Sequence, residues 1–144
     1  MIKASPKTGP RVHGVVETCI NVAEISRARD FYQSLFDFDT MASDDRFCAL
    51  RAGTDVLLLF IHGGSNEPVV IAGGTVPPHE TLGAGHLAFS ISADQLEIWR
   101  TRLLERGIEI ESEVHWERGG TSLYFRDPDV NLIELATPGV WPNY

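Results

Sequence analysis

Short runs rich in hydrophobic and β-branched residues mark several stretches of the first half, and each predicts a strand. The stretch 15–22, "VVETCINV", is rich in β-branched residues and comes first. Apolar residues at helical spacing follow within 24–38, "EISRARDFYQSLFDF", and predict a helix that packs on a sheet. Further strands are expected at 40–42, 48–51 and 56–61, with a glycine-containing turn between the last two.

The same order of elements returns in the second half. Residues 86–92 predict a strand and 92–107 a helix, and three more strand candidates follow at 108–114, 121–127 and 131–137. Between the halves, 62–85 is rich in Gly and Pro and is either a linker or a functional lid. The order β-α-β-β-β thus occurs twice, and superposing the halves matches Glu17 with His86.

This duplication predicts an α+β fold of two βαβββ modules. We expect a flexible N-terminal tail at 1–12 and a single domain at 13–144. Module one covers about 13–62, the linker about 63–84 and module two about 85–137. Because each predicted strand has one apolar face, we expect the helices to cover that face from the outside of the sheet.

The other face of three strands carries residues that bind metals. Strand parity puts Glu17 and Cys19 on this face in the first strand, His86 in the first strand of module two, and Glu134 in the last strand. Carboxylate oxygens and a neutral imidazole are metal ligands, and three protein ligands leave coordination positions open for a substrate. A water-facing edge strand would also explain Glu17, and a hydrogen-bonded core histidine would explain His86.

The amino-acid composition limits the classes of partner that the protein is expected to bind. The net charge of −8 argues against binding to a nucleic-acid backbone and mildly favours a cationic ligand. The apolar runs are too short for a signal peptide or a membrane span, and the two cysteines form no secretory framework. These features predict a soluble cytoplasmic protein.

Three segments resemble the vicinal oxygen chelate superfamily: "ETCINVAEISRARDFYQSLFDF", "GHLAFSI" and "YFRDPDVNLIEL". The superfamily includes glyoxalase I, extradiol dioxygenases, methylmalonyl-CoA epimerase, and fosfomycin- and bleomycin-resistance proteins, and the similarity covers about 12–139. It implies paired modules that form a cupped, half-open mixed sheet. It also implies a homodimer, with a site either within one chain or shared between two.

Carried over residue by residue, the resemblance places Glu17, His86 and Glu134 at three metal-ligand positions. A fourth position, used by glyoxalase I, falls near Leu58, which cannot bind metal. Glu17 replaces the usual His, so the site with one divalent ion is formally neutral. It favours Mg²⁺ or Mn²⁺, with Fe²⁺ and Zn²⁺ also compatible, and it is not the two-His-one-carboxylate set of iron oxygenases. Val130 replaces the usual Gly in the turn after Asp129, which implies a different turn shape.

The resemblance implies a divalent-metal-dependent enzyme that chelates vicinal substrate oxygens in lyase, isomerase or dioxygenase chemistry. Glu17 and Glu134 are expected to act in catalysis as proton acceptors, and Tyr124 as a proton donor. Cys19, Tyr124 and His79 are expected to contact the substrate. Tyr124 as a packing residue and His79 as a surface residue remain open alternatives. The alternative function is a metal-free drug-binding dimer of the bleomycin-resistance type.

Overall fold

The computed structural model describes residue 10 and residues 15–144, so the predicted tail lies outside the described residues except for Pro10. The elements of module one are β1 (Glu17–Val22), α1 (Ile25–Phe36), β2 (Asp39–Ser43), β3 (Phe47–Ala52) and β4 (Asp55–Ile61). A small hairpin follows, made of β5 (Val69–Ile71) and β6 (Gly74–Val76). The elements of module two are β7 (His86–Ser90), α2 (Leu96–Glu105), β8 (Ser112–His115), β9 (Thr121–Arg126) and β10 (Leu132–Ala136).

Each module forms one four-stranded mixed sheet with the same topology. The strand orders are β1-β4-β3-β2 and β7-β10-β9-β8. In both sheets the first strand of the module lies at one edge, and the last strand of the module is its parallel neighbour. The remaining strand pairs are antiparallel. The predicted α+β fold of two βαβββ modules is therefore confirmed.

Register relates the two sheets residue by residue. Glu17 lies opposite Val56 in module one, and His86 lies opposite Leu132 in module two. Two residues further along the last strand of each module, Leu58 corresponds to Glu134. Module one thus has an apolar side chain where module two has a carboxylate, as the resemblance implies.

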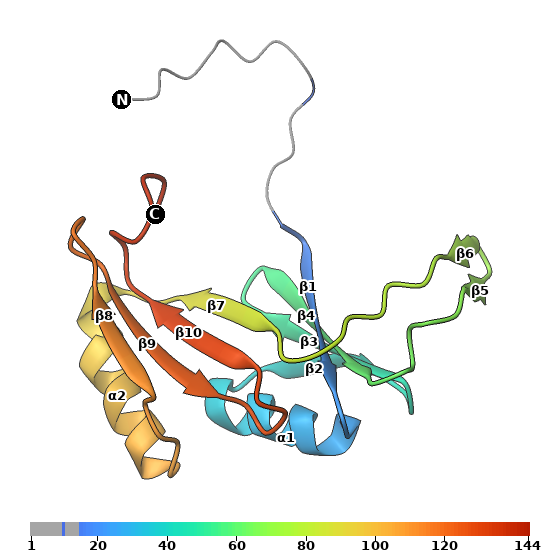
Figure 1. Cartoon of the computed structure of the whole chain (residues 1–144), viewed down its shortest axis with the longest axis horizontal. Helices are drawn as coiled ribbons and strands as arrows, with labels where there is room; N and C mark the ends of the chain where they lie inside the picture. The colour runs from blue at the N-terminus through green and yellow to red at the C-terminus, as the bar shows by residue number, and fades with distance from the viewer. Residues whose placement is uncertain (1–9, 11–14) are drawn as a thin grey trace.

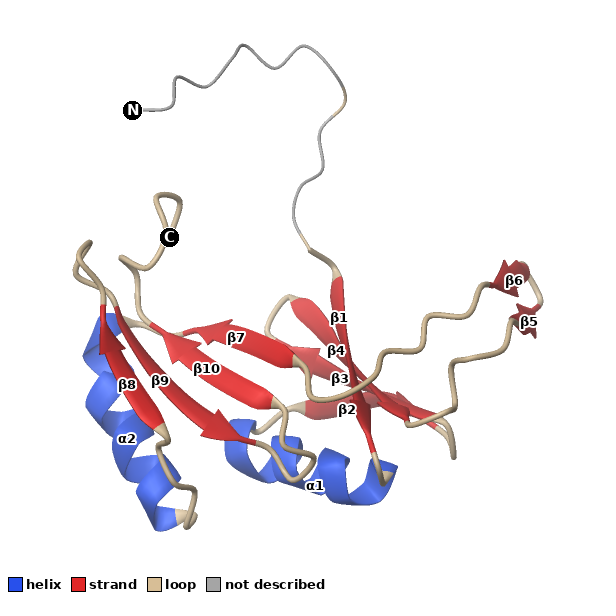
Figure 2. Cartoon of the chain, in the orientation of Figure 1, coloured by secondary structure: helices blue, strands red, loops and turns tan. Residues whose placement is uncertain are grey.

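The two helices lie on the same side of the sheets, and the opposite face of module two is open (Figures 1 and 2). Fully buried leucines and isoleucines from both modules join α1 in one core, which lowers the free energy of folding by removing apolar surface from water. Phe36 at the end of α1 contacts aromatic rings of both modules, including Phe38 and Phe89 at centroid distances of 5.1 and 4.8 Å. The core therefore joins the modules into one packed unit.

A buried polar network around Asp127 joins the modules a second time. Asp127 is 5% exposed, and its carboxylate accepts hydrogen bonds from the Tyr32 hydroxyl of α1 at 2.8 Å and from the Asn131 amide side chain at 2.9 Å. It also accepts the backbone amides of Asp129 and Asn131, both at 2.9 Å. Burial, and then the Asp127 charge, hold the pKa of Tyr32 well above its ordinary value, so the phenol stays a donor.

This network shapes the turn between β9 and β10. Val130 adopts φ 66°, a left-handed conformation that costs a β-branched residue free energy. The Asp127 carboxylate fixes the residues on either side of Val130, so the turn keeps this conformation without the glycine that the resemblance leads one to expect.

Two segments differ from the sequence-based expectation. Ile108 and Ile110 alternate like strand residues, but they pack against the core ahead of the strand, and β8 begins at Ser112. The long connection, predicted as either a linker or a functional lid with no strand of its own named, contains the β5–β6 hairpin, which projects away from the sheets in Figure 1. No helix among the described residues combines the length and apolar character needed to cross a membrane.

Candidate metal site

His86 and Glu134 form a close pair on the open face of module two. His86 Nε2 lies 3.3 Å from Glu134 Oε2, with the imidazole half exposed and the carboxylate almost fully buried. Their strands β7 and β10 are parallel neighbours, and the register places Glu134 opposite Ala88, one inner-face position beyond His86. The sheet itself therefore brings these two residues together across a long stretch of sequence.

A backbone contact orients the His86 ring. Its Nδ1 lies 2.9 Å from the carbonyl oxygen of Leu132. A carbonyl only accepts, so Nδ1 carries the proton and donates it, and in the neutral imidazole the lone pair is on Nε2. That lone pair faces a carboxylate oxygen, and two lone pairs repel unless a proton or a cation lies between them. A backbone carbonyl behind the non-ligating nitrogen is a common support for a metal-binding histidine.

Tyr124 holds the other oxygen of this carboxylate. Its hydroxyl donates to Glu134 Oε1 at 2.8 Å, because Tyr124 lies directly opposite Glu134 in the β9–β10 pair. Burial, and then the hydrogen bond to Glu134, raise the pKa of Tyr124 above its ordinary value. The phenol therefore stays protonated at neutral pH, and Oε2 of Glu134 is left for another partner.

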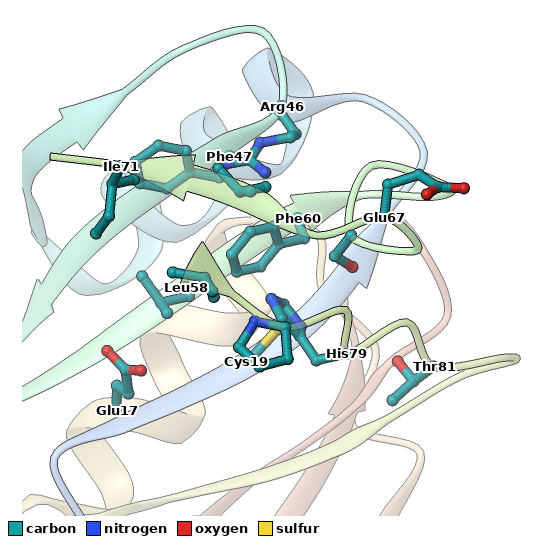
Figure 3. Close-up of a pocket in the computed structure, with 14 residues that line it drawn as sticks. Glu17, Cys19, Arg46, Phe47, Leu58, Phe60, Glu67, Ile71, His79 and Thr81 are labelled. Atoms are coloured by element: carbon teal, nitrogen blue, oxygen red, sulfur yellow. The ribbon is translucent and has the colours of Figure 1, made fainter. Parts of the chain in front are cut away.

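Glu17 lies in a different place. It is exposed at the start of β1 and lines one end of a cavity of about 500 Å³ on the open face of module one. Figure 3 shows Glu17 at one side of this cavity, with Leu58 and Phe60 beyond it. Neither His86 nor Glu134 is among the residues that line this cavity.

The orientation of β1 separates Glu17 from the pair. The side chain of Ile20, on the helix-facing side of β1, is the one that approaches Gly85, where an added Cβ would lie 3.5 Å from it. Thr18, on the same side, shares a small cavity with Leu87. Because alternate residues point to opposite faces, Glu17 points away from module two. Within residue 10 and residues 15–144, no three His, Cys, Asp or Glu side chains converge as a metal site.

The other residues predicted to contact the substrate also fall into two groups, one at the cavity of module one and one at the His86–Glu134 pair. Cys19 and His79 line the cavity with Glu17, while Tyr124 belongs to the His86–Glu134 pair. Burial, and then the charge of Glu17, raise the pKa of the Cys19 thiol, so it stays protonated at neutral pH. The ring of His79 lies edge-on against Phe60 at a centroid distance of 4.6 Å. Substrate contact by these residues remains a prediction.

Sequence reasoning did not identify most of the cavity wall, including Arg46, Phe47 and Phe60. The signal was present for Phe60, which shares the parity of Leu58 in β4. Phe47 pairs directly with Phe60 across β3 and β4, a register that only the fold reveals.

Glu80 fastens the linker beside the cavity. Its carboxylate accepts hydrogen bonds from the Gly63 amide at 2.9 Å, the Ser65 hydroxyl at 2.7 Å and the Asn21 side chain at 2.8 Å. These bonds, that from Gly63 first, lower the pKa of Glu80 from its ordinary value of 4.5. A lowered folded-state pKa means that the clamp contributes stability above pH 4.5, which is lost as the pH falls through the lowered value.

We expect the Glu80→Gln substitution to loosen this clamp at neutral pH. A neutral amide accepts fewer and weaker hydrogen bonds than a carboxylate. The backbone amides of Gly63 and Ser65, which donate to Glu80 at 2.9 and 3.2 Å, should therefore exchange with solvent several-fold faster. Hydrogen exchange followed by mass spectrometry measures this effect. Glu67→Gln, an exposed substitution in the same linker, is the matched control. Unchanged exchange at Gly63 and Ser65 would show that the carboxylate does not hold the linker.

Comparison with known proteins agrees with the fold and the motifs. The chain belongs to the Glyoxalase/Bleomycin resistance protein/Dioxygenase superfamily, whose pattern it matches over residues 14–135. It is 29% identical over 130 residues to the metallothiol transferase FosB of Shouchella clausii strain KSM-K16, covering 88% of this chain and 81% of that protein. It is 25% identical over 132 residues to the FosB of Bacillus licheniformis, covering 91% of this chain and 79% of that protein.

A solved structure is similar over nearly the whole chain. The crystal structure of lactoylglutathione lyase from Agrobacterium tumefaciens superposes with a TM-score of 0.84 at 25% sequence identity. The match covers 92% of this chain and 99% of that one. These relatives are named as enzymes, two metallothiol transferases and a lyase.

Proposed function

We propose that this protein is a divalent-metal-dependent enzyme that acts on a small molecule with two neighbouring oxygens. The observation that carries the proposal is the His86–Glu134 pair, in which a carbonyl behind the imidazole leaves a lone pair that faces a buried carboxylate oxygen. Two such donors, on adjacent strands with an open face, fit a hard or borderline divalent ion such as Mg²⁺, Mn²⁺, Fe²⁺ or Zn²⁺.

The third ligand of the proposal is Glu17 of a second chain. In a single chain Glu17 points away from the pair, and β1 and β7 each have a strand partner on one side only within the described residues. Val15 and Val16, which precede β1, are 70% and 72% exposed. Exposed valines leading into an edge strand favour association. A symmetric homodimer would cover these edges and supply each pair with a Glu17.

The chemistry we propose is group transfer or lyase chemistry. The bound ion would supply Lewis-acid stabilisation of developing oxyanion charge. Tyr124 holds Glu134 in place through its hydrogen bond, and in this proposal the exposed carboxylate of Glu17 would serve both as a ligand and as a proton acceptor. One His with two carboxylates is not the set that ring-cleaving iron oxygenases use, and the similar proteins include a thiol transferase and a lyase.

Metal binding tests the proposal directly. Untagged protein, purified without chelator and then supplied with Mg²⁺, Mn²⁺, Fe²⁺ or Zn²⁺ in turn, should retain about one ion per chain, because each dimer has two equivalent sites. His86→Ala and Glu134→Ala should each weaken binding at least about 100-fold, since each removes a ligand. Mass spectrometry of the metal content and calorimetric titration measure both effects.

His115→Ala is the matched control. His115 lies 3.6 Å from Glu113 in a similar His–carboxylate pair, but it is exposed, and Arg100 already binds that carboxylate. Its metal content should equal that of the unaltered protein. Failure of the unaltered protein to retain any of the four ions would contradict the proposal and favour metal-free ligand binding.

A further inference from the structure

The cavity of module one extends well beyond Glu17. On the inner face of this sheet, Cys19 lies opposite Leu58, and Asn21 lies opposite Phe60. The row with Phe60 is thus four residues along the strand from Glu17, about 13 Å at 3.3 Å per residue. A ligand that reaches from Glu17 to Phe60 must therefore be elongated.

The far end of the cavity is aromatic. Phe47 and Phe60 stack with a centroid distance of 5.8 Å and an interplanar angle of 25°. Leu58, Ile71 and Val76 add aliphatic walls, of which the last two come from the β5–β6 hairpin. Apolar walls with a few placed polar groups are the usual composition of a small-molecule site, and about 500 Å³ accommodates a drug-sized ligand.

A positive charge lies at this aromatic end. The guanidinium carbon of Arg46 is 5.9 Å from the ring centroid of Phe47 and 6.0 Å from that of Phe60. Figure 3 shows Arg46 above these rings, across the cavity from Glu17. Among the described residues, no Asp or Glu carboxylate lies within 4.0 Å of the Arg46 guanidinium. The carboxylates that do form ion pairs have partners other than Arg46.

The local structure holds Arg46 in this position. Asp44 Oδ1 accepts the backbone amides of Arg46 and Phe47 at 2.7 and 2.9 Å, which fixes the turn into β3. Gly64 lies against the Arg46 stem, where an added Cβ would come within 2.9 Å of it. A half-buried guanidinium that is held in place without a carboxylate partner is suited to bind an anion from solution.

We propose that this cavity binds a small organic anion with a planar apolar body, such as an aryl-substituted carboxylate or phosphonate. The anionic group contacts Arg46, the planar body lies against Phe47 and Phe60, and the opposite end points toward Glu17. The orientation deepens the proposed function, since Glu17 is the end at which substrate oxygens would meet the metal. Binding of the anion itself requires only module one and the linker with its β5–β6 hairpin.

Two carboxylates also line the cavity. Glu17 lies at the end away from Arg46, and Glu67 lies on the linker at the exposed rim. Both repel an anion, so the preference for negative charge depends on Arg46. Neutralising the rim with Glu67→Gln should therefore tighten binding of an anion.

Three probes of nearly equal size test the charge preference: 3-phenylpropionate, 3-phenylpropanol and 3-phenylpropylamine. Binding is measured by NMR titration of the full chain after removal of metal. We expect the carboxylate to bind about tenfold tighter than the alcohol, because a hydrogen bond to a charged group is stronger than one to a neutral group. The amine should bind most weakly.

Substitutions at Arg46 separate charge from packing. Arg46→Gln should remove the preference for the carboxylate over the alcohol, because Gln keeps a neutral hydrogen-bond donor but not the charge, and Arg46→Lys should keep part of the preference. Arg51→Gln, a substitution in β3 that lies outside the cavity lining, is the control and should change nothing.

Equal binding of the three probes, tighter binding of the amine, absence of binding, or an Arg46→Gln variant with full preference would each overturn this proposal. Because the titration uses metal-free protein, these outcomes do not bear on the metal site. Loss of metal binding in the earlier experiment would likewise leave the anion preference intact, so the two failures are distinguishable.

Discussion

Heterodimers of a Glu17→Ala chain and a His86→Ala chain should recover about half of the metal content of the unaltered protein, although each variant alone binds almost none. If the site is shared, each of the two metal sites of a dimer takes Glu17 from one chain and His86 with Glu134 from the other. One of the two metal sites in the mixed dimer then keeps all three ligands. Co-expression with two different non-histidine tags and sequential purification isolates the mixed dimer. Mass spectrometry then gives the metal content.

A second mixed dimer provides the control. His86 and Glu134 are contributed to a given metal site by the same chain. A dimer of a His86→Ala chain and a Glu134→Ala chain therefore lacks one ligand at each of its two metal sites, and its metal content should stay near zero. Recovery in the first mixture alone would support a site built from two chains. No recovery in either mixture would contradict the shared arrangement.

Asp127→Ala should destabilise the fold more than any substitution at the metal pair or in the cavity. It leaves the buried Tyr32 hydroxyl and the Asn131 side chain without their acceptor, and it frees the turn at Val130. Unsatisfied buried donors cost about 1–3 kcal/mol each, so we expect a loss of about 3–4 kcal/mol in the free energy of unfolding. For a chain of this size the melting temperature should fall by about 10 °C.

Urea unfolding and thermal scans measure this loss. Asp30→Ala, which removes an exposed carboxylate from α1, is the control and should change stability by less than about 0.5 kcal/mol. A similarly small change for Asp127→Ala would show that the network does not fasten the modules together.

The sequence predicted the fold and the inner-face residues well, because both depend on local periodicity. Strand alternation correctly grouped Glu17 with Cys19 in β1, and the duplicated order of elements correctly matched Glu17 with His86 in register. The same parity grouped Tyr124 with Glu134, and the structure joins them by a hydrogen bond.

The relative placement of the modules could not be predicted in this way. It depends on which side of β1 meets module two, and that is decided by long-range packing of Ile20 and Phe36 rather than by any repeating pattern. The β5–β6 hairpin had a local signal, since β-branched residues flank two glycines at 73 and 74, but Gly and Pro elsewhere in the segment hid it. Arg46 was missed because it lies just before its strand.

The opposite orientations of Glu17 and the His86–Glu134 pair have a genetic consequence under the proposed dimer. A chain that is defective only at Glu17 would be complemented by a chain that is defective only at the His86–Glu134 pair. A chain with defects on both faces would leave neither metal site complete in a dimer with an intact chain. Its product would therefore inactivate the normal chains with which it pairs. Such an allele would act as a dominant negative, whereas two alleles with defects on different faces would restore partial activity when present together.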